Sequence, residues 1–276
     1  MNITGKARVA AVLGWPVSHS RSPKLHGHWL QRYGIDGAYV PLAVRPEALS
    51  DALRGLAALG FAGANVTLPH KEATLAAADE ATPRAKEIGA ANTIVVRDGK
   101  LIADNTDGFG FIENLRQGAP TWDAARGPAV VLGAGGASRA VIHALLAARA
   151  PEVRLLNRTR ERADALANAF SSVRVLDWGD RSALSDAALL VNTTSLGMTG
   201  QPPLEIALDG LPPSALVTDL VYSPLETALL AAARARGHAT VDGLGMLLHQ
   251  ARPGFAAWFG REPEVDDALR RAVLAG

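Results

Sequence analysis

The sequence contains no cysteine, which excludes disulfide bonds, thiolate nucleophiles and metal centres held by cysteine. It also lacks an excess of charge, because 28 basic and 27 acidic side chains leave a formal net charge of +1 and no global field for nucleic acid or an anionic membrane. No stretch approaches the ~18 apolar residues of a membrane-spanning helix, and the apolar run 9–15 is too short for a secretion signal. We therefore expect a soluble, cytoplasmic protein with no nucleic-acid or membrane partner.

Lysine is scarce as well, since only five of the 28 basic residues are lysines. A lysine inside a polar motif is therefore not part of a general lysine background. The 276 residues, of which 48% are hydrophobic, are enough for one large or two ordinary domains, each with its own core.

Short β-type runs alternate with alanine-rich helical stretches, a pattern typical of an α/β protein with parallel sheets. In the first part we predict strands over 8–14, 38–44, 63–67 and 93–97, a tight hairpin at Asp98-Gly99, and helices over 23–33 and 46–59. In the second part we predict strands over 128–132, 153–156, 188–192 and 216–221, and helices over 137–148, 160–170, 224–236 and 244–259. The proline-rich stretch 199–213 is predicted to be an exposed loop.

A glycine-rich turn follows the strand 128–132 and opens the next helix: Gly133-Ala134-Gly135-Gly136-Ala137-Ser138-Arg139. Gly133 permits the tight turn and Gly135 permits a close approach to a pyrophosphate, whose charge the helix N-terminus favours. The third glycine of the dinucleotide pattern is replaced by Ser138. Glycine at that position serves mainly the close packing of helix against strand, so the replacement is tolerable. The alternative is a strand-to-helix turn that binds nothing.

The end of the next strand indicates which dinucleotide is bound. An NAD site places a carboxylate there to bind the ribose 2′-hydroxyl, but this chain has no acid before Glu161. Arg158, supported by Asn157, Thr159 and Arg162, is suited to a 2′-phosphate. A solvated basic helix start is the alternative, but cations at a helix N-terminus oppose its dipole unless an anion is bound. The pattern favours NADP over NAD.

Three polar constellations occur in the first part of the chain. Ser20 and Ser22 can both present hydroxyl groups to an anion or a polyol, although Ser22 before Pro23 is also typical of a helix cap. Thr67 and Lys71 follow the strand 63–67 and lie about one helical turn apart, although an exposed surface lysine is the ordinary alternative.

Asn92 and Asp107 complete this set, although a turn asparagine and a helix N-cap would explain them too. Asp107 follows the last strand of the first part, where a cleft between two domains would open. His26, His28 and His70 lack the carboxylates that would complete a metal site, so we predict none.

Together these motifs resemble the shikimate dehydrogenase family nearly end to end. The motifs that carry the resemblance are His19-Ser20-Arg21-Ser22-Pro23, Asn65-Val66-Thr67 with Lys71, Gly89 to Thr93, Asp104 to Gly108, Gly133 to Arg139, Asn157-Arg158-Thr159, Asn192 to Met198, Asp219 to Tyr222, and Asp242 to Met246 with Gln250. Trp15, Pro83 and Thr193 are small departures that remove no functional group.

The resemblance implies two α/β domains. An N-terminal substrate domain would comprise residues 1–106 plus 243–276, with the C-terminal helices returning to it, and a Rossmann-type doubly wound domain would comprise residues 107–242. The enzyme would be a monomer or a homodimer.

The family's site residues carry over to this chain position by position. Ser20, Ser22 and Tyr222 would hold the substrate carboxylate, and Thr67, Asn92 and Gln250 would bind ring hydroxyls. Lys71 and Asp107 would form the catalytic pair. NADP would contact Gly133, Ala134, Gly135, Gly136, Ala137, Asn157, Arg158, Thr159, Arg162, Leu220 and Gly243.

The implied activity is the reversible NADPH-dependent reduction of 3-dehydroshikimate to shikimate, in chorismate and aromatic amino acid biosynthesis. A sibling quinate/shikimate enzyme with relaxed cofactor choice tends to carry an acid just after the Asn-Arg pair, where this chain has Thr159-Arg160. A catalytically silent NADP sensor is a further alternative, but it would need neither Lys71 nor Asp107.

Overall fold

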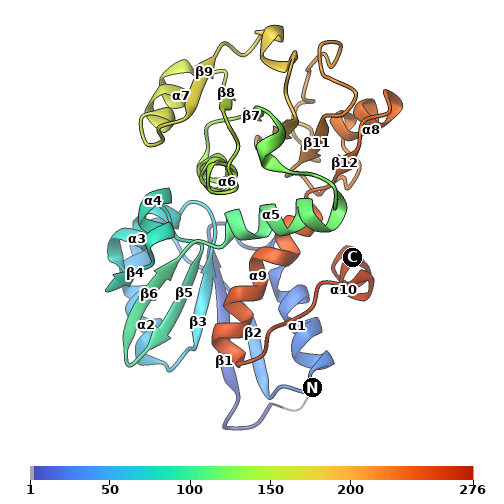
Figure 1. Ribbon diagram of the computed structural model, residues 1–276. Coiled ribbons are helices and arrows are strands. Elements are labelled where there is room, and N and C mark those ends of the chain that lie inside the picture. The colour runs from blue at the N-terminus through green and yellow to red at the C-terminus, as the bar shows by residue number, and fades with distance from the viewer. Residues whose placement is uncertain (1–2, 276) are drawn as a thin grey trace. The chain divides into compact units, whose positions relative to one another are not determined.

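The computed structural model describes residues 3–275 of the chain (Figure 1). It forms two compact units, one of Met1–Thr106 with Leu248–Gly276 and the other of Asp107–Leu247. Each unit contains a six-stranded sheet, so the α/β class expected from the alternating pattern is confirmed.

The sheet of the first unit is mixed, and the expectation of a parallel sheet is wrong for it. Its strands lie in the order β2 (Gly37–Ala43), β1 (Arg8–Gly14), β3 (Gly63–Val66), β5 (Thr93–Arg97), β6 (Lys100–Asp104) and β4 (Glu80–Ala81). β5 runs antiparallel to both β3 and β6. The predicted hairpin is the reason: Asp98 (φ 52°) and Gly99 (φ 75°) form a two-residue turn, which joins only antiparallel neighbours.

Six helices belong wholly or mostly to this unit: α1 (Ser22–Arg32), α2 (Leu49–Ala58), α3 (Lys71–Ala77), α4 (Pro83–Ile88), α9 (Leu244–Phe259) and α10 (Asp267–Leu274), together with the 3₁₀ turn η1 (Pro46–Ala48). α9 packs through Trp258, which is fully buried and donates its indole N–H to the Ile94 carbonyl at 2.9 Å. A Cβ at Gly63 would lie 2.2 Å from the Trp258 Nε1 atom, so this close approach requires glycine. The C-terminal segment is therefore part of the first unit's core.

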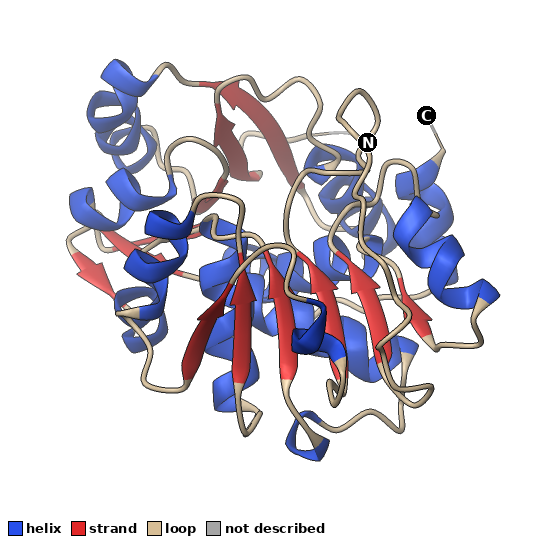
Figure 2. Cartoon of the chain, turned by 90° about the horizontal axis from the view of Figure 1, so that it is seen from above, coloured by secondary structure: helices blue, strands red, loops and turns tan. Residues whose placement is uncertain are grey.

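The sheet of the second unit is parallel throughout. Its strands lie in the order β12 (Thr240–Val241), β11 (Leu216–Asp219), β10 (Leu189–Asn192), β7 (Ala129–Leu132), β8 (Val153–Leu156) and β9 (Val173–Leu176). Numbered within the unit this is 6-5-4-1-2-3, the doubly wound dinucleotide-binding order. In Figure 2 the arrows of one sheet point in a single direction, with helices on both sides of it. In this order the chain reverses between β7 and β10, and such folds bind ligands at the carboxyl ends of the strands there.

The helices of this unit are α5 (Asp107–Gly118), α6 (Gly136–Ala147), α7 (Arg160–Ala167) and α8 (Ala228–Ala235), with the 3₁₀ turns η2 (Ala124–Arg126) and η3 (Arg181–Leu184). The stretch 199–213 is irregular, as predicted, and mostly exposed. Leu204, Leu208 and Leu211 are nevertheless buried in an apolar cluster of this unit. These three leucines anchor the loop to the sheet.

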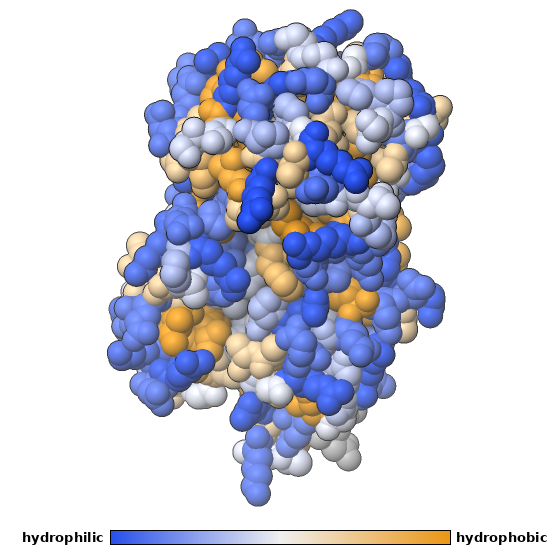
Figure 3. Space-filling model, in the orientation of Figure 1, coloured by the Kyte–Doolittle hydropathy of each residue, from blue (hydrophilic) through white to orange (hydrophobic). Residues whose placement is uncertain are grey.

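The face seen in Figure 3 is mainly hydrophilic, with small separate hydrophobic areas. Within residues 3–275, no helix combines the length and the apolar character that crossing a membrane requires.

Candidate active site

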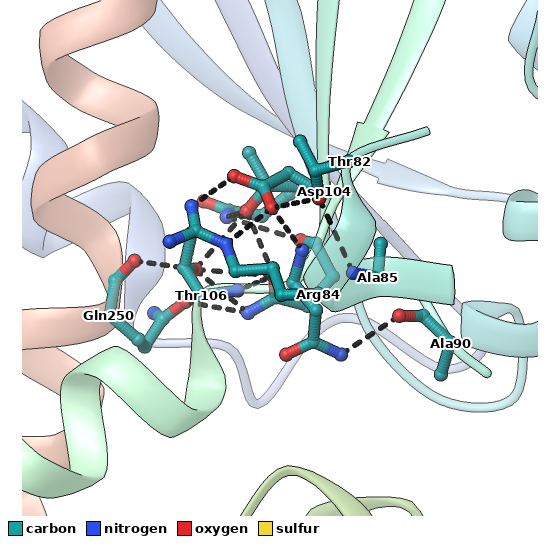
Figure 4. A network of polar contacts seen from close by, with 11 residues as sticks. Thr82, Arg84, Ala85, Ala90, Asp104, Thr106 and Gln250 are labelled. Carbon is teal, nitrogen blue, oxygen red and sulfur yellow. Dashed lines mark hydrogen bonds and ion pairs between the residues drawn. The ribbon is translucent and has the colours of Figure 1, made fainter. Parts of the chain in front are cut away.

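In the first unit, the buried Asn92 forms hydrogen bonds to both Thr106 and Gln250, two residues of the polar network that Figure 4 labels. Its Oδ1 atom accepts from the Thr106 N–H at 2.8 Å, and its Nδ2 atom donates to the Gln250 Oε1 atom at 3.2 Å. The Thr106 hydroxyl donates to the Gln250 backbone carbonyl at 2.8 Å. The structure thus brings together two predicted site residues, Asn92 and Gln250, through Thr106, which sequence reasoning did not select.

An ion pair holds the segment before Thr106 in place. Asp104 accepts hydrogen bonds from Arg84 (Nε, 2.6 Å), from Thr82 (2.7 Å) and from the Asn105 N–H (2.8 Å), and a second Arg84 nitrogen completes the pair. Burial alone would raise the pKa of Asp104, but the bonds from Arg84 and Thr82 outweigh it and hold the pKa below its usual value. The Asn105 amide donates to the Ala90 carbonyl at 2.9 Å. The backbone that leads to Asp107 is therefore fixed from both sides.

Tyr39 and Asn65 extend the network to β2 and β3. The Tyr39 hydroxyl donates to the Asn65 Oδ1 atom at 2.7 Å, and the Asn65 amide donates to the Asn92 carbonyl and the Thr93 hydroxyl, both at 3.3 Å. His26 stacks on the Tyr39 ring with the centroids 3.9 Å apart. Burial lowers the pKa of His26 to about 3, an effect that the neighbouring Asn65 only partly offsets, so the imidazole is neutral at ordinary pH.

Ser20 and Ser22 lie at the start of α1. The N-cap of α1 is Arg21, and no side chain forms a capping bond there, so the structure does not support Ser22 as the helix cap. Instead the Ser20 hydroxyl accepts from the Ser22 N–H at 3.3 Å. Ser22 itself is buried beside Tyr39.

Thr67 and Lys71 follow β3, as the sequence predicts. The Thr67 N–H donates to the Leu13 carbonyl at 2.9 Å, which fixes the turn against β1. Lys71 is the first residue of α3 and is partly buried, and its carbonyl accepts from the Ala91 N–H at 2.9 Å. This backbone bond places Lys71 beside the segment that carries Asn92.

In the second unit, Asp107 is the first residue of α5 and is buried. It follows Thr106 directly in the chain. Tyr222 lies three residues after the end of β11 and is partly buried. Both residues interact with other parts of the protein.

The glycine-rich turn has the conformation that the dinucleotide pattern predicts. Gly133 has a φ of 104°, and a Cβ there would lie 2.7 Å from the Thr194 methyl group, so glycine is required. The Ala134 N–H donates to the Asn157 Oδ1 atom at 3.2 Å and the Gly135 N–H donates to the Ser138 hydroxyl at 3.0 Å. A Cβ at Gly135 or Gly136 would meet nothing within 4 Å.

These bonds show which backbone groups remain for an anion. Because the N–H groups of Gly133, Ala134 and Gly135 already have acceptors, the donors left at this turn include those of Gly136 and Ala137. These are the first two residues of α6, whose N–H groups have no acceptor within the helix.

The arginines at the start of α7 differ in whether their side chains are paired with carboxylates. Arg160 is held by Asp164 at 3.0 Å and by Asp177 at 3.2 Å. Arg158 and Arg162 are exposed, and within the described part of the chain neither side chain has a hydrogen bond or an ion pair. Arg158 is thus available for an anion, whereas Arg160 is not.

Leu220 and Gly243 are brought together after β11 and β12. A Cβ at Gly243 would lie 2.3 Å from the Leu220 carbonyl oxygen, so only glycine fits. In residues 3–275 the structure contains no group of three His, Asp or Glu side chains that could hold a metal ion.

Three models of known protein families match this chain, and all three describe shikimate dehydrogenases. The family model for the shikimate dehydrogenase substrate binding domain matches residues 12–94, the shikimate/quinate 5-dehydrogenase model matches residues 119–195, and the model for the C-terminal domain of shikimate 5′-dehydrogenase matches residues 243–274. The NADP(+) shikimate dehydrogenase of Rhodospirillum rubrum is 67% identical, over 99% of both chains. The chain belongs to the shikimate dehydrogenase family.

Solved members of the shikimate dehydrogenase family share the fold. The shikimate 5-dehydrogenase of Thermus thermophilus, solved in complex with NADP(H) and shikimate, is 40% identical with a TM-score of 0.87 and covers 96% of this chain and 99% of its own. A quinate dehydrogenase of Corynebacterium glutamicum, solved with NAD, is 31% identical with a TM-score of 0.90 over 98% of this chain and 99% of its own.

Sequence reasoning missed several residues that form the polar network around Asn92. Thr106 and Asn65 lie inside the family motifs named above. Those motifs indicated that the region is functional, but they did not indicate which hydrogen bonds these two residues form. Tyr39 and Arg84 stand in no motif and were not selected. Their places in the network depend on strand pairing between distant segments, which no local pattern reveals.

Proposed function

We propose that this chain is an NADP-dependent shikimate dehydrogenase that reversibly reduces 3-dehydroshikimate to shikimate. One observation carries the proposal: a polar network built from Asn92, Thr106 and Gln250 in a member of this family, with Lys71 fixed beside it. The chain would serve the biosynthesis of chorismate and the aromatic amino acids. We expect it in the cytoplasm, as a monomer or a homodimer.

Each of the two units has its own proposed role. We assign substrate binding and catalysis to residues 1–106 plus 243–276 and NADP binding to residues 107–242. The substrate-binding family model at residues 12–94 supports this assignment, as does the doubly wound strand order of the second unit.

The residues of the second unit fit NADP. The N–H groups of Gly136 and Ala137 would hold the pyrophosphate, and the open space at Gly135 and Gly136 would allow its approach. Arg158, with Asn157, Thr159 and Arg162 beside it, would hold the 2′-phosphate, which NAD lacks. The Leu220–Gly243 backbone contact would lie against the nicotinamide end, whose dihydro form supplies a hydride to the substrate carbonyl carbon when bound.

Substrate recognition falls to neutral polar groups. Ser20, Ser22 and Tyr222 would hold the carboxylate, and Thr67, Asn92 and Gln250 would bind ring hydroxyls. Asn92 and Gln250 are already oriented by their mutual hydrogen bond, so less rotamer freedom is lost on binding.

The reaction leaves negative charge on the former carbonyl oxygen, and a proton must reach it. Lys71 would stabilise that charge and donate the proton, and Asp107 would orient the ammonium group and bind a substrate hydroxyl.

The test is a matched set of four assays with the purified full chain, following absorbance of the reduced nicotinamide. Shikimate and quinate are each combined with NADP and with NAD. We expect the largest kcat/KM with shikimate and NADP. A preference for quinate and NAD would identify the sibling enzyme. If neither substrate led to reduction of NADP or NAD, the protein would be a sensor. Either result contradicts the proposal.

A further inference from the structure

Thr193, the first residue after β10, contacts the glycine-rich turn although it lies 55 residues from Ser138 in sequence. Its hydroxyl donates to the Leu132 carbonyl at 2.7 Å and lies 2.7 Å from the Ser138 hydroxyl. Ser138, fully buried in the first turn of α6, accepts from the Gly135 N–H at 3.0 Å. Three elements therefore meet through two hydroxyl groups: the end of β7, the start of α6 and the loop after β10.

The direction of every bond in this chain is determined by its two ends. A carbonyl oxygen only accepts, so the Thr193 hydrogen goes to Leu132, and a backbone N–H only donates, so Gly135 donates to Ser138. The Ser138 hydrogen therefore goes to Thr193. The sequence of donors is Gly135 N–H, Ser138 hydroxyl, Thr193 hydroxyl, Leu132 carbonyl.

This arrangement has a consequence for anion binding. The hydroxyl hydrogen of Ser138 is used within the protein, and the Gly135 N–H donates to Ser138, so the N–H groups left at the turn are those that follow, including those of Gly136 and Ala137. The Thr193 hydroxyl links Ser138 to the sheet, because its acceptor is the carbonyl of the last residue of β7.

We propose that Thr193 is a positioning residue for the dinucleotide: its hydroxyl pre-organises the glycine-rich turn for the pyrophosphate without touching the ligand. This inference rests on the proposed binding of NADP. Without the hydroxyl, Ser138 loses its acceptor and the turn samples other arrangements in the free protein. Binding must then order the turn again, which weakens affinity.

The experiment measures NADP+ affinity of the full chain by isothermal titration calorimetry. Thr193→Val keeps the shape and removes the hydroxyl, and we expect Kd for NADP+ to rise about threefold to tenfold, the range for the loss of one hydrogen bond. Thr193→Ser restores the hydroxyl and should bind within twofold of wild type.

Thr218→Val is the matched control. Thr218 is buried in β11, whereas Thr193 is partly buried, and like that of Thr193 its hydroxyl donates to a backbone carbonyl, that of Val241 at 2.8 Å, but it has no hydrogen bond to the glycine-rich turn. We expect this variant to lose thermal stability and to keep the wild-type Kd for NADP+.

A second probe separates the pyrophosphate from the rest of the ligand. Adenosine 2′-monophosphate has the 2′-phosphate but no pyrophosphate, so Thr193→Val should leave its affinity unchanged. An unchanged Kd for NADP+ in Thr193→Val, equal weakening in Thr218→Val, or equal weakening for adenosine 2′-monophosphate would each overturn the positioning role. If the wild-type chain itself failed to bind NADP+, the proposed function would fall first, and this inference with it.

Discussion

Arg158 and Arg160 are two residues apart, yet only Arg158 is available for a ligand. Arg160 is committed to Asp164 and Asp177. We expect Arg158→Ala to raise KM for NADP roughly ten- to hundredfold, since hydrogen bonds to charged groups contribute about 1.5–3 kcal/mol. KM for shikimate should change little. The measurement is initial-rate kinetics with each substrate varied in turn.

Arg160→Ala is the control for that variant, because it removes the same charge from the same helix start. It should leave KM for NADP near the wild-type value. Equal effects of the two substitutions would mean that only the net charge of α7 matters, and an unchanged KM in Arg158→Ala would exclude its role at the 2′-phosphate.

Lys71 is the residue on which the proposed chemistry depends. We expect Lys71→Ala to lower kcat by about 10²–10⁴, the range for a positioned acid or base, with NADP affinity nearly intact. Lys100→Ala is the control, because Lys100 is an exposed lysine of the same unit that pairs with Glu80 at 2.9 Å. Near-normal turnover in Lys71→Ala, measured at saturating substrates, would rule out the mechanism.

Asp107→Ala should also lower kcat, and the Lys71/Asp107 double variant tests whether the two act together. Residues that act as a unit lose less in combination than the sum of the single effects. Strictly additive losses in activation free energy would count against a shared proton-transfer device.

At the scale of elements, a single carboxylate joins the ends of two strands in the second unit. Asp219, the last residue of β11, accepts from the Asn192 amide at 2.9 Å, the Val221 N–H at 3.0 Å and the Thr227 hydroxyl at 2.7 Å. Burial raises the pKa of Asp219 although all three bonds oppose this change. Through these bonds β10, the turn toward Tyr222 and the N-cap of α8 are held together.

Asp219→Asn replaces one acceptor oxygen with a donor while keeping the size of the side chain. We expect the free energy of unfolding to fall by about 1–3 kcal/mol, because a buried donor is left without its acceptor. Urea denaturation measures it. Asp180→Asn is the control: Asp180 accepts from Ser182 at an exposed turn, where asparagine caps as well as aspartate, so we expect a change near zero. Equal losses in both variants would contradict the assigned role of Asp219.

At the scale of the whole molecule, His26 gives stability a dependence on pH. Its pKa is about 3 in the folded chain against 6.5 in the unfolded chain, so below pH 6.5 the unfolded state gains a proton that the folded state does not. Stability is therefore lost as pH falls from about 6.5 toward 3. The carboxylates whose pKa values are lowered, such as Asp104, act in the same direction but only below about pH 4.

Between pH 7 and pH 5, we expect the free energy of unfolding to fall by about 2 kcal/mol more in wild type than in His26→Leu. Leucine neither titrates nor leaves a buried polar atom unpaired, so the difference between the two proteins isolates His26 from other titrating groups. Urea denaturation followed by tryptophan fluorescence measures it, since Trp29 and Trp258 lie beside His26. His19→Leu, at an exposed position, should retain the wild-type dependence. Parallel pH profiles for wild type and His26→Leu would refute the assignment.

The sequence by itself determined the features that depend on neighbouring residues. The strands 8–14, 93–97 and 153–156 and the helix 244–259 have the predicted bounds, because β-type runs, turn residues and helical periodicity act over a few residues. The tight Asp98-Gly99 turn and the glycine-rich turn were predicted for the same reason. Chain order also placed Ser20, Thr67, Lys71 and Asp107 at strand ends or helix starts.

Only the tertiary structure decided what depends on segments far apart in the chain. β4 and β12 have two residues each, too few to form a pattern, and exist because longer strands pair with them. The mixed sheet, the meeting of Asn92 with Gln250, the commitment of Arg160 to Asp177 and the contact of Thr193 with Ser138 depend on which strands and helices become neighbours. Local chemistry selects a residue's conformation, but packing of the whole chain selects its partners, and here the partners decide which groups remain for a ligand.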